Sequence, residues 1–131
     1  MDIAFPWPVS QGEWLAWISA AATVLLGLLF LFAPRAGFRL IGLPRPADSP
    51  RALAASRASI AGFQLGLGLS ALLLAQPLIY LSLGFAWAFA LFGRIVSMMS
   101  DDGNGLRNWT WAAVEALLAA LPLAFAFGLV A

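Results

Sequence analysis

The sequence predicts an all-α integral membrane protein, built as one domain of four transmembrane helices over residues 1–131. Of the 131 residues, 63% are apolar and only 10% are charged, whereas soluble domains carry about 25% charged residues. Such a chain cannot cover a water-soluble surface with polar groups. The composition therefore excludes a cytosolic enzyme and a nucleic-acid-binding protein.

Four mostly apolar runs, at residues 14–33, 53–75, 78–99 and 109–130, are each long enough to cross a bilayer. Their alanine and leucine content and their few β-branched residues favour helices over strands. Gln76 and Pro77 leave almost no loop between the second and third runs. We therefore expect these two helices to form a tight antiparallel hairpin.

The long connection between the first two spans contains a further short element. Residues 37–43 combine apolar side chains with Arg39, which predicts a short segment lying in the membrane interface. Asp48 or Ser49, followed by Pro50, is a favourable start for the second membrane helix.

The connection between the third and fourth spans is a polar turn over residues 100–108. Asn108 is placed to cap the fourth helix. Asp101 and Asp102 resemble the start of a calcium loop, but the later ligands of such a loop are missing. We predict a simple turn there and no metal site.

The basic residues predict the orientation of the bundle. Alternating spans place both termini on one side, and that side has no basic residue. All seven basic residues are arginines in the two opposite loops or at the helix ends facing them: Arg35, Arg39, Arg45, Arg51, Arg57, Arg94 and Arg107. The positive-inside rule then places both termini outside the cytoplasm. Residues 1–33 lack the basic start of a cleaved signal peptide, so we interpret the first run as a retained helix.

Arg57, Arg94 and Glu115 are the charged residues expected inside the helices, at similar depth near the arginine-rich side. Charge within a bilayer is costly, and a glutamate cannot reach the interface as an arginine can. We therefore expect Glu115 to be protonated or paired with Arg94 or Arg57. The cluster is interpreted either as a pocket for an anionic headgroup or a proton, or as an ion pair that fixes the helix register.

The second span carries Gln64 between Gly62 and Gly66, which have GxxxG spacing. Small residues at this spacing let helices approach closely in a membrane. The stripe predicts packing within the bundle, with a homodimer contact or another subunit as the alternative.

Two further features concern the third and fourth spans. Trp87 and Trp111 lie near the charged residues, where they either pack or line a pigment or quinone site. Pro122 leaves a backbone carbonyl near Leu118 without its helical donor.

The chain has no cysteine and no histidine. This excludes disulfides, thiolate or imidazole metal sites, His-ligated haem, and catalysis by Ser–His or Cys–His pairs. We predict no cofactor and no enzymatic activity.

The pattern resembles a family of small bacterial four-helix integral membrane proteins classed as a domain of unknown function, loosely similar to DoxX-like proteins. The resemblance covers residues 14–130 and implies the fold, a bacterial inner membrane with periplasmic termini, and no known activity. Its motifs are Arg57 ahead of Gly62, Gly66 and Gly68, then Gly93-Arg94, Asp102-Gly103 and Glu115.

Three functions fit these features. The first is a non-catalytic accessory or structural subunit of a respiratory or photosynthetic membrane complex, in contact with lipids and with other membrane subunits or a second copy. The alternative is a small transporter or lipid- or quinone-binding protein that uses Arg57, Arg94 and Glu115, with Gln64 further in. The third, a membrane enzyme, would have to rely on Glu115 with acidic residues of the 100–108 turn.

Overall fold

A computed structural model of the chain describes residues 5–41, 49–100 and 105–130, and every regular element within these ranges is helical. The elements are α1 (Gln11–Phe32), α2 (Pro34–Ile41), α3 (Pro50–Ala55), the π-helical turn η2 (Ser56–Ile60), α4 (Ala61–Leu74), α5 (Pro77–Ser100) and α6 (Leu106–Ala126). Four stretches are long and apolar enough to cross a membrane: Gln11–Phe32, Pro50–Leu74, Pro77–Ser100 and Leu106–Ala126. The all-α prediction and the four apolar spans are confirmed.

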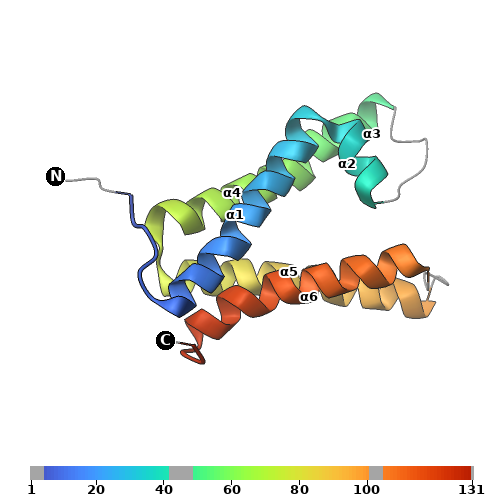
Figure 1. Cartoon of the computed structure of the whole chain (residues 1–131). Helices are drawn as coiled ribbons and strands as arrows, with labels where there is room; N and C mark the ends of the chain where they lie inside the picture. The colour runs from blue at the N-terminus through green and yellow to red at the C-terminus, as the bar shows by residue number, and fades with distance from the viewer. Residues whose placement is uncertain (1–4, 42–48, 101–104, 131) are drawn as a thin grey trace.

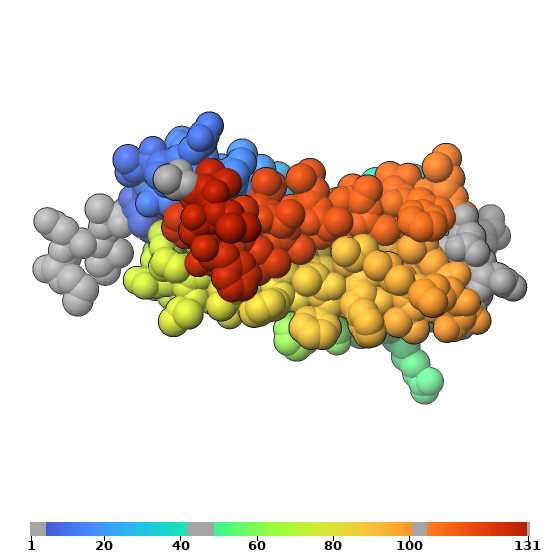
Figure 2. Space-filling view, turned by 90° about the horizontal axis from the view of Figure 1, so that it is seen from below, coloured from blue at the N-terminus to red at the C-terminus, as the bar shows by residue number. Residues whose placement is uncertain are grey.

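The long helices are arranged as two pairs. α1 packs against α4, α5 packs against α6, and α1 also contacts α6. Figure 1 shows the pairs meeting at the end where both termini lie and separating toward the end that carries α2. Seen from below, α5 and α6 lie side by side along the molecule (Figure 2).

The predicted hairpin between the second and third spans is only partly correct. The turn is tight, because Ala75 ends α4 in the left-handed conformation (φ 50°) and α5 begins at Pro77. The two helices then diverge, however, since α4 follows α1 and α5 follows α6 (Figure 1).

Glycines explain these pairings. A Cβ on Gly68 would lie 3.1 Å from the Ala20 carbonyl oxygen of α1, and a Cβ on Gly84 would lie 3.3 Å from the Ala119 carbonyl oxygen of α6. Gly62 and Gly66, by contrast, have nothing within 4 Å of such an atom. The predicted GxxxG stripe therefore does not pack within the bundle, because α4 turns its Gly68 face toward α1.

The helix ends confirm one predicted cap and correct two other expectations. Ser49 caps α3 by accepting a hydrogen bond from the Ala52 amide at 3.0 Å. Asn108 does not cap the fourth span, because α6 already begins at Leu106, with Gly105 at the N-cap. That helix ends at Ala126 rather than at 130, since Gly128 (φ 73°) forms a Schellman motif. Asp48 and residues 101–104 lie outside the described residues.

Candidate functional site

Arg94 of α5 and Glu115 of α6 form an ion pair, which is one of the alternatives that the sequence left open for Glu115. Nε of Arg94 lies 2.5 Å from Oε1 of Glu115, and Nη2 lies 3.4 Å from Oε2. The Glu115 side chain is 7% exposed and that of Arg94 is 22% exposed. The glutamate is thus almost fully enclosed against its partner.

A third polar residue supports this pair. Nη1 of Arg94 donates a hydrogen bond to Oδ1 of Asn108 at 2.8 Å. Asn108 lies two turns before Glu115 on α6, so both side chains project from the same face of that helix. The residue expected to cap the helix therefore orients the guanidinium group instead.

Arg57 does not join the pair. Its Nε donates to the Leu31 carbonyl at 3.0 Å, and the neighbouring Ser56 hydroxyl donates to the Phe30 carbonyl at 2.8 Å. These donors satisfy carbonyl groups in the last turn of α1, which have no partner within that helix. The expectation that Arg57, Arg94 and Glu115 form one cluster is wrong for Arg57, because η2 and α4 pack mainly against α1 rather than against α5.

A cavity of about 160 Å³ lies beside the ion pair, bounded by side chains of α1, α2, η2, α4, α5 and α6. Its polar wall consists of Arg94, Glu115 and Gln64, and Trp87 and Trp111 form part of the rest. Oε1 of Gln64 is buried and has no hydrogen-bond partner. An unsatisfied buried acceptor of this kind is uncommon in folded proteins.

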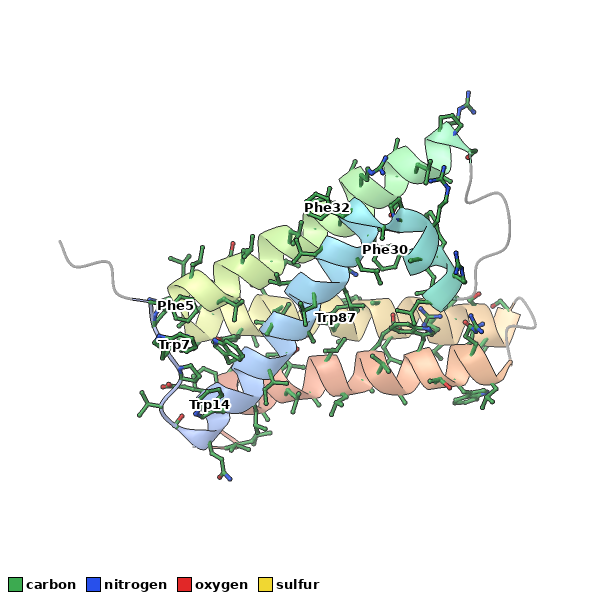
Figure 3. The ribbon with its side chains drawn as sticks, turned by 45° about the horizontal axis from the view of Figure 1, so that its top comes forward. Phe5, Trp7, Trp14, Phe30, Phe32 and Trp87 are labelled. Atoms are coloured by element: carbon green, nitrogen blue, oxygen red, sulfur yellow. The ribbon has the colours of Figure 1, made fainter. Side chains whose placement is uncertain are left out.

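The indole of Trp87 is held by a chain of hydrogen bonds through the core. Its Nε1 donates to the Thr23 hydroxyl at 2.9 Å, and that hydroxyl donates to the Ser19 carbonyl at 2.8 Å. The Ser19 hydroxyl donates to the Leu118 carbonyl at 2.6 Å. In Figure 3, Trp87 points from α5 toward α1, between the two helix pairs.

The freed carbonyl that Pro122 predicted near Leu118 is therefore present, and Ser19 is its partner. We did not identify Ser19 or Thr23 from the sequence. The two residues are four positions apart in an apolar run, which places both hydroxyls on one face of the helix. This spacing could have indicated from the sequence that they make contacts between helices.

The short helix α2 covers the arginine-rich end of the cavity, where Ile41 contributes to the lining. Nε1 of Trp111 donates to the Leu40 carbonyl at 3.3 Å, and Nη1 of Arg107 donates to the Arg39 carbonyl at 2.8 Å. The predicted short segment over 37–43 is thus a helix as far as Ile41, attached to α6 by its last carbonyl groups. Residues 42–43 lie outside the described part of the chain.

An apolar groove adjoins the cavity between α1 and α6. It has a volume of about 390 Å³ and shares Leu26 and Trp111 with the cavity. Except for the indole of Trp111, only alanine, leucine and valine side chains line it. The cavity with its polar wall and the apolar groove are therefore neighbours that meet at Leu26 and Trp111.

No cluster of three or more histidine, cysteine, aspartate or glutamate residues occurs within residues 5–41, 49–100 and 105–130. Asp101 and Asp102, which the enzyme hypothesis required, lie outside these ranges. Glu115 itself faces Arg94.

A family described as Domain of unknown function (DUF4345) matches residues 12–126 of the chain. No curated protein matches the chain, and neither does any solved structure. The predicted membership of a domain of unknown function is confirmed, whereas the bacterial origin and the likeness to DoxX-like proteins stay predictions.

Proposed function

The chain belongs to the DUF4345 family, whose function is unknown, and we propose that it binds the polar end of a membrane-soluble amphiphile such as a lipid or a quinone. The observation that supports this proposal is that Gln64 lines the same cavity as the Arg94–Glu115 pair and that its buried Oε1 has no hydrogen-bond partner. The binding site contains Gln64, Arg94 and Glu115, without Arg57.

The contrast between the cavity and its surroundings favours a small molecule over simple helix packing. An ion pair that only fixed the helix register would be enclosed by close-packed side chains, as protein interiors generally are. Here the pair adjoins about 160 Å³ of unfilled space. That volume suits one headgroup or a few water molecules.

The neighbouring groove suits the rest of an amphiphile. Its apolar walls on α1 and α6 begin where Leu26 and Trp111 leave the cavity. A ligand with its head beside Glu115 would therefore place its tail among apolar side chains that face outward. Binding sites of this type combine a mostly apolar lining with a few polar groups that fix orientation.

Native mass spectrometry of the protein released from membrane-derived nanodiscs tests this proposal. We expect the full chain to carry an amphiphile of defined mass. Gln64→Met, which keeps the side-chain length and removes the amide, should lower the affinity by about tenfold, as loss of one buried hydrogen bond predicts, and so reduce the occupancy.

Ser70→Leu provides the matched control, because Ser70 is exposed on the same helix and does not line the cavity. It should leave the occupancy unchanged. A protein that carries no amphiphile in its native membrane, or equal occupancy in both variants, would contradict the proposal.

A second function, that of an accessory subunit in a larger bacterial inner-membrane complex, is favoured by a different surface. Gly62 and Gly66 face open space on α4, and the exposed, hydroxyl-bearing Ser59 lies just before them on η2. Small and hydroxyl-bearing residues are typical of contacts between membrane helices. Blue-native electrophoresis after mild solubilisation should then show the chain in a large complex or as a homodimer, and Gly66→Leu should release it as a monomer.

For either function we propose the orientation that the arginines predict. The end carrying α2 would face the cytoplasm and both termini would lie in the periplasm, in a non-catalytic protein of the bacterial inner membrane. Transport of the bound molecule would extend the first function, and counterflow of labelled ligand in proteoliposomes tests it.

A further inference from the structure

We infer that an open pocket between α2 and α6 binds the phosphate group of an anionic membrane lipid, with Arg107 as its charged residue. The pocket has a volume of about 500 Å³ and is lined by Leu40, Leu106, Arg107, Thr110 and Trp111. It is separate from the cavity beside Glu115, although Trp111 borders both. The inference therefore goes beyond the proposed amphiphile-binding function, and either can be wrong without the other.

Two hydrogen bonds build the pocket from segments that are far apart in the sequence. Nη1 of Arg107 donates to the Arg39 carbonyl at 2.8 Å, and Nε1 of Trp111 donates to the Leu40 carbonyl at 3.3 Å. These contacts hold the last turn of α2 against the first two turns of α6. The walls of the pocket are thus in place before a ligand binds, which lowers the entropy cost of binding.

The pocket carries positive charge. The Arg39 carbonyl that accepts from Arg107 is uncharged, and none of the five lining residues is acidic. Within residues 5–41, 49–100 and 105–130 the acidic side chains are Glu13 and Glu115. Glu115 faces Arg94, and Glu13 lies in the first turn of α1 at the opposite end of the bundle. A guanidinium group in this setting suits a phosphate, which it can bind through two parallel hydrogen bonds.

The excess of positive charge extends over the whole α2 end of the bundle (Figure 1). The other exposed arginines there are Arg35, Arg39, Arg51 and Arg57. Over residues 34–115 the complete sequence has seven arginines and four acidic residues. Basic pockets between membrane helices, flanked by further arginines, are typical of sites for anionic lipid headgroups.

The apolar part of the lining favours a lipid over a soluble phosphate. Arg107 lies in the first turn of a helix long and apolar enough to cross a membrane. Trp109 is exposed in the same turn, and tryptophan is enriched at the depth of lipid headgroups. Leu40 and Leu106 are 49% and 84% exposed beside the arginine. They could contact the glycerol and the first acyl carbons of a lipid whose phosphate meets Arg107.

A matched pair of lipids tests the inference on the purified full chain in neutral detergent. Dioleoylphosphatidylglycerol and dioleoylphosphatidylcholine share their tails and their phosphate, but only the first has a net negative charge. Native mass spectrometry during titration measures the affinity for each. Arg107→Gln removes the charge of the pocket. Arg51→Gln is the matched control, because Arg51 is exposed at the same end, on α3, and does not line the pocket.

We expect phosphatidylglycerol to bind about fivefold more tightly than phosphatidylcholine, as one arginine beside an anionic lipid predicts. Arg107→Gln should remove this preference, whereas Arg51→Gln should retain it. Leu106→Glu provides a second variant, since Leu106 is 84% exposed and contributes little to packing. It places a carboxylate in the pocket and should also remove the preference.

Equal loss of the preference in Arg107→Gln and Arg51→Gln would show a diffuse attraction of anionic lipid to this end and would overturn the assignment to the pocket. Equal affinities of the unaltered chain for both lipids would overturn it too, as would a preference that persists in Arg107→Gln and Leu106→Glu. Displacement of phosphatidylglycerol by millimolar inorganic phosphate would indicate a site for soluble anions and overturn the lipid assignment.

Discussion

The hydroxyl of Ser19 on α1 donates a hydrogen bond to the Leu118 carbonyl of α6 at 2.6 Å, and this is the carbonyl that Pro122 deprives of its helical donor. A proline inside a membrane helix leaves a polar group that must find a partner elsewhere. Here the partner comes from a neighbouring helix. The contact therefore joins the first and last spans at the depth of the core.

This contact predicts a coupled pair of substitutions. Ser19→Ala leaves the Leu118 carbonyl unsatisfied and should lower the free energy of unfolding by about 1–3 kcal/mol. In a Pro122→Ala background the restored amide serves that carbonyl, so the same Ser19 substitution should cost about 1 kcal/mol less. Unfolding in mixed micelles by SDS titration measures the four proteins, and additive losses would contradict the assignment.

The ion pair predicts a second non-additive result. Arg94→Met leaves the enclosed Glu115 carboxylate without compensation and should destabilise the protein by about 3 kcal/mol. Adding Glu115→Gln removes the unpaired charge and should recover part of that loss. SDS titration again supplies the measurement, and a double variant less stable than Arg94→Met alone would show that the pair does not act as described.

The glycines of α4 predict opposite effects two residues apart. A Cβ on Gly68 would lie 3.1 Å from both the Ala20 carbonyl oxygen and the Val24 amide nitrogen, so Gly68→Ala should push α1 and α4 apart at a cost of about 1–3 kcal/mol. Gly66→Ala meets nothing within 4 Å and should stabilise the helix by about 1 kcal/mol. The unfolding free energies of the two variants check this, and equal effects would refute the packing assignment.

The turn between α4 and α5 predicts a stabilising substitution. Ala75 has φ 50°, a conformation that favours glycine. Because a left-handed alanine costs about 1–2 kcal/mol, Ala75→Gly should raise the free energy of unfolding by about 1 kcal/mol. Ala90→Gly, at an exposed position inside α5, is the control and should lower it by about 1 kcal/mol. A loss of stability in both variants would argue against this turn.

The sequence predicted the features that depend on local chemistry. Long apolar runs located the four spans, the Ser49-Pro50 pair located the start of the second, and Pro122 indicated a freed carbonyl near Leu118. Each of these signals acts within one helix or one turn. These signals can therefore be interpreted without knowing how the helices are arranged.

The candidate site depended on arrangement and was only partly predictable. Similar depth suggested that Arg57, Arg94 and Glu115 meet, but depth does not specify which helices are neighbours. Because α4 pairs with α1, Arg57 donates to the Leu31 carbonyl, and Arg94 forms the ion pair with Glu115. The prediction that the GxxxG stripe packs within the bundle was wrong for the same reason: Gly68 rather than Gly66 faces α1.

The most direct test of the amphiphile site is photo-crosslinking in native membranes. The probe is a lipid-like amphiphile with a diazirine beside its polar headgroup, and the labelled peptides are sequenced by mass spectrometry. Labelling should map to cavity residues such as Leu26, Ile60 and Trp111, and excess unlabelled amphiphile should compete it away. Labelling confined to outward-facing residues such as Phe63 and Phe89, with no competition, would contradict a binding site beside Arg94 and Glu115.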